Sequence, residues 1–213
     1  MKKEIIELAI RSPKKGVDQN DFETAKNAAV KKLVSLKGIG PEREFEPFST
    51  VPKKEEKVYV GMTKYASQGK VYRAMLSLGF ISKLMKFMKK MDPMAGVFIR
   101  PTDPNFDYEK FANKENVTEI ALLKPKPGIT KEAFLNERES FLSALDAEPE
   151  VVKSYTFKVT GGFKGKDTFP HFTIYKDKAA FEAVTSRVGN QEYVHDFFKV
   201  FDVEIITFNT TLK

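Results

Sequence analysis

The sequence predicts an α+β protein that contains the same βαββαβ unit twice, with the two sheets packed against each other. Residues 4–22 match residues 116–134 at a shift of 112, where Pro13 falls on Pro125 and Gly16 on Gly128. Residues 63–98 match residues 173–208 at a shift of 110. Strand and helix patterns follow the same order in both halves, which indicates one duplicated unit.

The first unit is predicted to span residues 1–101. It begins with a strand at residues 5–11, which ends before Pro13. Asp18 is a suitable N-cap for a helix whose apolar residues recur at helical spacing as far as Leu36. The remaining elements are strands at residues 43–48 and 58–65, a long amphipathic helix at residues 67–91 with Gly79 as a possible bend, and a strand at residues 96–100.

The second unit is predicted to span residues 116–213 and to repeat this order. Residues 102–115 form the predicted linker, which Phe106, Tyr108 and Phe111 are expected to anchor. The predicted elements are strands at residues 117–123, 151–159, 169–175 and 203–210, a helix at 131–145, and a helical region at 178–200 broken near Gly189.

Composition narrows the classes of protein that remain. The 213 residues suffice for two units of about 100 residues, each with a modest core. Cysteine is absent, which excludes disulfides and cysteine-ligated zinc, and we predict no metal site. The apolar stretch at residues 5–10 is too short for a signal sequence and no run has the length of a membrane span, so we expect a cytoplasmic protein without a membrane partner. The net charge of +7 permits an anionic partner without requiring one.

The βαββαβ order is typical of the ferredoxin-like arrangement, in which helices cover one face of a four-stranded antiparallel sheet. The helix-free faces of two such sheets need cover, so we expect them to face each other within one chain and to enclose a site. By elimination, the more polar parity of the first and third strands is predicted on that inner face. The residues concerned are Glu7, Arg11, Tyr59, Tyr65, Glu119, Phe169, His171, Thr173 and Tyr175.

Residues 175–208 carry a resemblance to a known group. An aromatic strand end at Tyr175 is followed by a helix start, then by the segment 193–198 with His195 among aromatic residues, then by a closing strand. This layout resembles the dimeric α/β-barrel superfamily and, within it, the antibiotic biosynthesis monooxygenase-like domains. The resemblance implies a barrel of two facing sheets, here within one chain. Members of that group include cofactor-free oxygenases of polycyclic aromatic substrates and haem-binding or haem-degrading proteins.

The chain departs from that group in two ways. Several catalytic members use a tryptophan, which is absent here. Haem-degrading relatives pair an asparagine on the first strand with a histidine on the second helix, whereas the first strands here carry Glu7 and Glu119. His195 alone fits that pattern and is the candidate ligand if the protein binds haem; otherwise we predict no cofactor.

Glu119, His171 and Tyr175 are the candidate catalytic residues. Because the first and third strands pair in this topology, Glu119 and His171 are expected to meet across strands beside Tyr175. Such a pair is suited to abstract a proton from a phenol or enol, after which oxygen reacts with the carbanion. The alternatives are a carboxylate paired with a cation, such as Arg11 in the first unit, and a hydrogen-bonded structural histidine. The sequence favours a small-molecule-binding barrel protein that acts as a cofactor-independent monooxygenase on an aromatic substrate, and it leaves open a haem-binding barrel protein or a non-catalytic binding module.

The candidate ligand-binding residues suit an apolar or aromatic small molecule. They are Glu7, Arg11, Tyr59, Tyr65, Phe169 and Thr173. The same aromatic residues also suit simple barrel filling. The tandem layout fits a monomeric pseudo-dimer or a homodimer.

Two further patterns remain. A methionine row on the 67–91 helix and its flank suits either the core side of that helix or an adaptable binding surface, next to a basic face with Lys83 and Lys86. Tandem RNA-recognition domains share the βαββαβ order, which makes a nucleic-acid-binding module the alternative of a different class. However, Glu7 and Glu119 would repel phosphate, and neither third strand carries the stacking motif of those domains.

Overall fold

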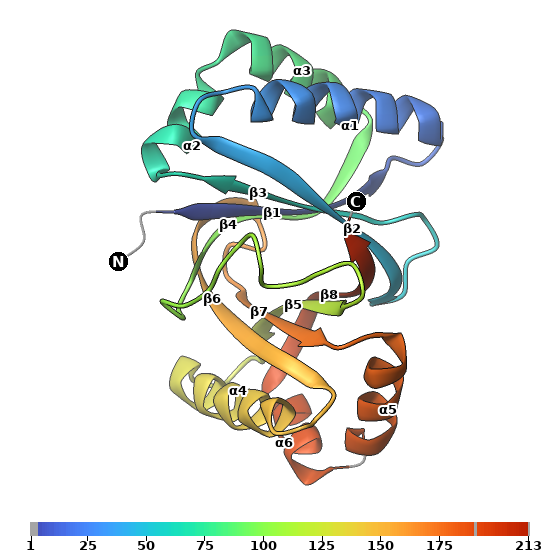
Figure 1. Ribbon diagram of the computed structural model, residues 1–213, viewed down its shortest axis with the longest axis vertical. Helices are drawn as coiled ribbons and strands as arrows, with labels where there is room; N and C mark the ends of the chain where they lie inside the picture. Colours follow the sequence, from blue (N-terminus) through green and yellow to red (C-terminus); the bar gives the residue numbers. More distant parts are fainter. Residues whose placement is uncertain (1–3, 190, 213) are drawn as a thin grey trace.

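The computed structural model describes residues 4–189 and 191–212. The first unit contains β1 (Ile5–Pro13), α1 (Gln19–Val34), β2 (Ile39–Val51), β3 (Tyr59–Tyr65), α2 (Gln68–Met75), α3 (Leu78–Met88) and β4 (Met91–Pro101). The second unit contains β5 (Val117–Pro125), α4 (Lys131–Asp146), β6 (Val151–Lys164), β7 (Phe169–Tyr175), α5 (Lys178–Val188), α6 (Glu192–Val200) and β8 (Phe201–Leu212). In Figure 1 the strands lie between a layer of helices α1–α3 and a layer of helices α4–α6.

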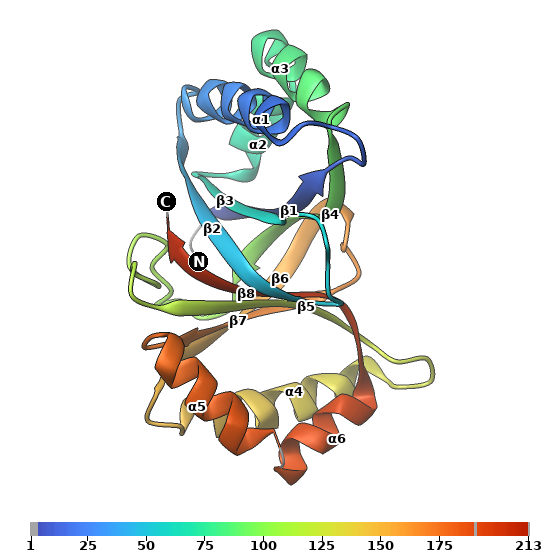
Figure 2. The ribbon, with the colours of Figure 1, turned by 90° about the vertical axis from the view of Figure 1, so that its right-hand side faces the viewer.

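The eight strands form one closed antiparallel barrel in the order β1-β3-β2-β8-β5-β7-β6-β4. Each unit supplies four neighbouring strands, and the pairs β2–β8 and β4–β6 join the two sheets at both edges. Figure 2 shows the strands wrapping around a common interior, with both helical layers outside. The predicted fold class is confirmed: two ferredoxin-like units form an α/β barrel within one chain.

Two predicted elements differ in extent from the structure. The helix predicted at residues 67–91 is divided into α2 and α3, and the break lies at Leu76–Ser77 rather than at Gly79. Strands β2 and β6 are longer than predicted, because each pairs with a strand of its own unit and also with a strand of the other unit. Gly161 and Gly162, beyond the strand predicted at residues 151–159, therefore lie within β6. A Cβ on Gly162 would come within 3.0 Å of the backbone of Val97 on β4, so only glycine fits this pairing.

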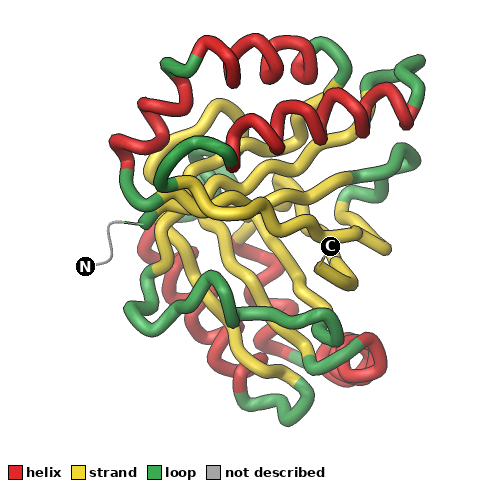
Figure 3. The backbone as a smooth tube through the Cα atoms, turned by 45° about the horizontal axis from the view of Figure 1, so that its top comes forward, coloured by secondary structure: helices red, strands yellow, loops and turns green. Residues whose placement is uncertain are grey.

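The barrel interior is a filled core. One parity of the central strands points inward, and the chain between β4 and β5 adds three aromatic side chains that are almost fully buried. The inward residues include Ile6, Leu8, Ile10, Val60, Met62, Val97, Ile99, Ile120, Leu122, Phe172 and Ile174, and those from the linker are Phe106, Tyr108 and Phe111. The predicted anchoring of the linker by these aromatic residues is thus confirmed. Figure 3 shows this connecting loop crossing beside the strands.

The prediction that the more polar parity lies between the two sheets is wrong. Glu7 and Glu119 point away from the barrel axis, toward the helices, because their neighbours Leu8 and Ile120 on the other parity fill the barrel core. The elimination failed because both faces of each sheet are covered, one by the other sheet and one by helices. The most uniformly apolar parity therefore occupies the barrel, where an unpaired polar group would be costly to bury.

Arg43 on β2 holds the linker against the barrel. Its guanidinium donates hydrogen bonds to the carbonyl oxygens of Tyr108 at 2.6 Å, Glu109 at 3.0 Å and Ala112 at 3.2 Å. The same group lies over the rings of Tyr108 and Phe111, at 5.5 and 5.0 Å from their centroids. The planar fork of arginine donors suits this set of acceptors, which a lysine could not satisfy.

We expect Arg43→Ala to lower the free energy of unfolding by about 3 kcal/mol, because three carbonyl groups lose a charged donor. Chemical denaturation measures this change. Arg73→Ala is the matched control, since Arg73 is exposed on α2 and its removal is expected to change stability by only about 0.5 kcal/mol or less. Equal effects of the two substitutions would show that Arg43 does not anchor the linker.

Candidate functional site

Each unit encloses a cavity between the outer face of its sheet and its helices. The first-unit cavity has a volume of about 300 Å³ and is bounded by β1, β3, β4, α2 and α3; Glu7, Arg11 and Tyr65 line it. The second-unit cavity has a volume of about 260 Å³ and is bounded by β5, β7, β8 and helices α4–α6; Glu119, His171 and Tyr175 line it. Six of the predicted site residues thus gather at two related places, on the side of the sheet opposite to the one expected.

A carboxylate and a tyrosine are hydrogen-bonded in both cavities. Tyr65 Oη donates to Glu7 Oε2 at 2.5 Å, and Tyr175 Oη donates to Glu119 Oε2 at 2.9 Å. The strand register creates both pairs. Glu7 lies opposite Thr63, which is two residues before Tyr65 on the same face of β3, and Glu119 lies opposite Thr173, two residues before Tyr175 on β7. Burial, reinforced by the neighbouring carboxylate, raises the pKa of Tyr65 and of Tyr175 well above the usual value. Both tyrosines therefore remain neutral donors.

His171 lies next to Glu119 in the second-unit cavity. His171 pairs in register with Ala121, which is two residues from Glu119 on the same face of β5. The side chains of His171 and Glu119 therefore project from neighbouring strands to the same side of the sheet. His171 Nε2 is 3.8 Å from Glu119 Oε1, and the imidazole is 1% exposed. Neither ring nitrogen has a hydrogen-bond partner among the described residues. The ring of Phe141 on α4 lies edge-on to the imidazole at 6.4 Å between centroids. Glu119 thus has Tyr175 at one oxygen and His171 near the other.

The first unit carries an ion pair where the second carries the histidine. Gly61 occupies the position of His171, and Arg11 Nη2 forms an ion pair with Glu42 Oε1 at 2.9 Å beside it. A Cβ on Gly61 would lie 3.2 Å from Arg11 Nη2 and closer still to the Glu42 carboxylate, so no larger residue fits there without a shift. The Arg11 pairing considered from the sequence thus exists, but its partner is Glu42 rather than Glu7. The two cavities are consequently related in position and different in chemistry.

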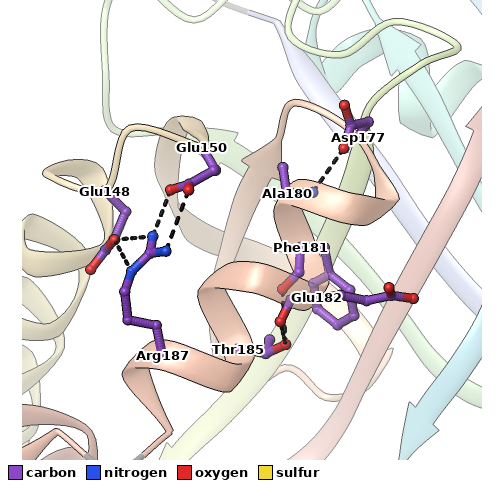
Figure 4. A network of polar contacts seen from close by, with 8 residues as sticks. All are labelled: Glu148, Glu150, Asp177, Ala180, Phe181, Glu182, Thr185 and Arg187. Atoms are coloured by element: carbon purple, nitrogen blue, oxygen red, sulfur yellow. Dashed lines mark hydrogen bonds and ion pairs between the residues drawn. The ribbon is translucent and has the colours of Figure 1, made fainter.

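A polar clamp fixes the helix that closes the second-unit cavity. Arg187 on α5 binds Glu148 Oε2 at 2.5 Å and Glu150 Oε2 at 2.6 Å, both in the turn between α4 and β6 (Figure 4). The Asp177 side chain accepts a hydrogen bond from the backbone of Ala180 at 2.8 Å and caps the first turn of α5. Thr185 of this helix lines the cavity. The cavity wall is therefore held in place at both ends of α5.

Four predicted site residues lie outside these two cavities. Tyr59 donates a hydrogen bond to Glu23 Oε1 at 2.5 Å, away from Glu7. Phe169 packs against Phe134 with ring centroids 5.1 Å apart. Thr173 is fully buried, with its hydroxyl 3.2 Å from that of Ser154. His195 is exposed on α6. None of these four lines the cavity of its unit.

The residues present do not fit a bound haem. An axial histidine must present a ring nitrogen to the iron from the wall of a pocket. His195, the ligand expected under the haem alternative, is an exposed residue that does not line the second-unit cavity. The imidazole that does line the cavity, His171, has its Nε2 atom close to the Glu119 carboxylate. The described residues also contain no cluster of three or more histidine, aspartate or glutamate side chains suited to a metal ion.

Sequence reasoning missed Arg138 on α4. Its side chain is 9% exposed, it lies over the rings of Phe134 and Phe169, and its Nη1 atom has no hydrogen-bond partner among the described residues. Burial lowers the pKa of Arg138 to about 10. The 112-residue shift aligns it with Lys26, which is ion-paired with Glu44. A basic residue at the same position of both repeats, Lys26 and Arg138, was therefore the sequence pattern that could have identified this buried cation.

Comparisons with known proteins bear on the fold. No family model and no curated protein matches the sequence. An anthrone oxidase-like protein has a TM-score of 0.68 at 10% identity, over 99% of this chain and 93% of that chain. A candidate monooxygenase from Fusobacterium nucleatum subsp. nucleatum ATCC 25586 has a TM-score of 0.62 at 12% identity, over 99% and 93%.

A chlorite dismutase from Candidatus Nitrospira defluvii is also similar, with a TM-score of 0.54 at 11% identity over 97% of this chain and 91% of that one. In all three, the similarity extends over nearly the whole of both chains. At such low identity it concerns the fold and not the activity. The chain therefore has the dimeric α/β-barrel fold, formed by two ferredoxin-like units in tandem.

Proposed function

We propose that this protein binds an aromatic small molecule in the second-unit cavity and acts on it as a cofactor-independent monooxygenase. The proposal rests on the Tyr175–Glu119–His171 arrangement on the wall of a largely apolar cavity. The rest of that wall is largely apolar and includes the rings of Phe141, Phe197, Phe201 and Phe208. Such a surface suits a planar apolar ligand, with a few polar groups to orient it.

The polar residues of this wall are arranged for proton abstraction. His171 has ring nitrogens without partners among the described residues, so it is the group able to accept a proton from a substrate. Glu119 Oε1 lies 3.8 Å from His171 Nε2, where its charge stabilises the imidazolium that forms. Tyr175 holds the other oxygen of Glu119 and fixes the direction of the carboxylate. His171 is thus the base, and Glu119 its positioning partner.

The reaction needs only the substrate and dioxygen. Removal of a proton from a carbon activated by neighbouring phenol or enol groups leaves a carbanion, which bonds to one oxygen atom of O₂. The resulting peroxide anion takes up a proton and becomes a hydroperoxide. The carbon then loses its second hydrogen as a proton while the O–O bond breaks, and the released hydroxide takes up that proton, which leaves a carbonyl group and water. Both hydrogens of the substrate carbon end in water, and all electrons that reduce O₂ come from the substrate. The apolar side chains around His171 limit the access of solvent that would reprotonate the carbanion.

The fold neighbours are consistent with this proposal. One is described as a monooxygenase candidate and another as anthrone oxidase-like, a name that refers to an aromatic substrate. The first unit has the same hydrogen-bonded carboxylate and tyrosine, but Gly61 occupies the position of the proposed base His171. The first unit therefore lacks the base that the proposed reaction requires. We infer that the second unit catalyses the reaction and that the first unit mainly completes the barrel.

We expect Glu119→Gln and His171→Ala each to reduce turnover by roughly 10²-fold or more, the usual scale for loss of general acid–base help. A thermal-shift screen with anthrones, quinones and aromatic polyketides identifies ligands, and oxygen uptake with those ligands measures turnover. Glu7→Gln is the matched control, because Glu7 has the same tyrosine partner in the first unit. It should reduce turnover far less, and equal losses from the Glu7 and Glu119 variants would refute the assignment of the reaction to the second unit.

The Glu7 carboxyl offers a separate test based on pH. Burial raises the pKa of Glu7 above its ordinary value of 4.5, an effect opposed by the hydrogen bond from Tyr65 and the charge of Arg11. A carboxyl with a raised pKa binds its proton more tightly in the folded state. Its contribution to stability is fully present below pH 4.5 and is lost as the pH rises through the raised value.

We therefore expect Glu7→Gln to become progressively more stable than the wild type as the pH rises above 4.5, since the amide stays neutral throughout. Denaturation curves at a series of pH values measure this difference. Glu150→Gln is a suitable control of opposite sign, because the Arg187 side chain lowers the pKa of Glu150. A stability difference between wild type and Glu7→Gln that did not change with pH would contradict the placement of Glu7.

A further inference from the structure

The corner formed by α2 and α3 exposes an unusual number of large apolar side chains. Leu76 is 81% exposed and Leu78 is 86% exposed, at the junction of the two helices. Four more apolar residues on the same two helices are also exposed: Tyr72, Met75, Met85 and Met88. The core position considered for this methionine row is thus wrong for Met75, Met85 and Met88. Together these six residues form the apolar corner.

Helical spacing places the exposed apolar residues of each helix together. Tyr72 on α2 and its C-cap residue Leu76 are four residues apart, and Leu78 and Met85 on α3 are seven residues apart, so each pair shares one side of its helix. Met75 from α2 and Met88 from α3 both line the first-unit cavity while remaining exposed. The mouth of that cavity therefore opens at the corner.

The charge around the apolar corner has a single sign. Residues 66–91 contain six lysine and arginine residues and no aspartate or glutamate, in a chain whose net charge is +7. Lys83, Lys86 and Lys89 are exposed on α3 and form no ion pair with the described residues. Lys90 is paired with Asp21 at 2.9 Å. Most of the excess positive charge of the protein thus lies beside its most exposed apolar side chains.

The second unit provides an internal comparison. The equivalent residues 176–201 contain four basic and four acidic residues. Among the described residues of α5 and α6, Phe198 is the exposed large apolar side chain, at 55%. Both units have the same fold and need the same helices to cover their sheets. The apolar and basic character of α2 and α3 is therefore not a requirement of the fold.

We propose that the apolar corner docks on the surface of a lipid bilayer that contains anionic lipids. Leucine, tyrosine and methionine side chains insert into the interfacial region, while lysines beside them meet lipid phosphates, which is how amphipathic helices lie on membranes. The concentration of unpaired positive charge favours an anionic bilayer over an apolar protein surface. No described helix is long and apolar enough to cross a membrane, so the contact is a peripheral one.

Sedimentation with vesicles tests this proposal. We expect the protein to bind vesicles of phosphatidylcholine and phosphatidylglycerol in equal amounts, to bind pure phosphatidylcholine much more weakly, and to be released by salt. Leu76→Ser/Leu78→Ser should weaken binding by about 30-fold or more, since two leucine side chains that would enter the bilayer are lost. Val152→Ser, at an exposed apolar residue of β6, should leave binding unchanged.

A second pair of variants isolates the charge. Lys83→Gln/Lys86→Gln should weaken binding by about 10-fold or more. Lys53→Gln/Lys54→Gln, with the same change in net charge on the exposed loop between β2 and β3, should leave it nearly unchanged. Absence of binding, equal binding to neutral vesicles, or equal losses from both lysine pairs would overturn the proposal. A dimer in analytical ultracentrifugation that the Leu76→Ser/Leu78→Ser variant dissociates would overturn it in favour of a second copy of the chain.

Discussion

The structure depends on the hydrogen bonding of its sheet edges. A four-stranded ferredoxin-like sheet leaves two edge strands with unpaired backbone groups, which a folded protein must cover or pair. Here β2 pairs with β8 and β4 pairs with β6, so that each edge of one unit satisfies an edge of the other. Closure in this way also decides which residues meet. It turns the inner faces of both sheets into one core and leaves the outer faces to the helices, where the cavities lie.

The sequence was informative where a pattern was local or repeated. The shifts of 112 and 110 predicted the duplicated βαββαβ order, and the pairing of first and third strands predicted that Glu119 and His171 would lie close together. The choice between the two faces could not be made in this way. Leu8 and Glu7 alternate on a strand whose two faces are both covered, so neither burial nor polarity identified the side that meets the other sheet. The division into units at residues 1–101 and 116–213 stays a prediction.

The remaining misses also involve contacts distant in sequence. Nothing near Arg43 indicates that it binds carbonyl groups of residues 108–112, and nothing near Phe163 indicates that its ring lies over Gly96 of the other unit. His195 had a suitable aromatic context, but a shift of one residue along a helix is enough to direct a side chain to solvent: Val194 is buried and His195 is exposed. The starts of helices were easier to predict, because a side-chain acceptor caps the first turn of α1, α4 and α5. The capping residues are Asp18, Thr130 and Asp177.

The presence of both units in one chain affects how the sequence of such a protein can diverge. In a homodimer with two-fold symmetry, every substitution appears twice, and a residue that suits one subunit is imposed on the other. The covalent linker held by Arg43 removes that constraint. Gly61 and His171 differ although they occupy the same position on β3 and β7. The fused barrel can therefore keep one half rigid while the other diverges, a freedom that no symmetric pair of identical subunits has.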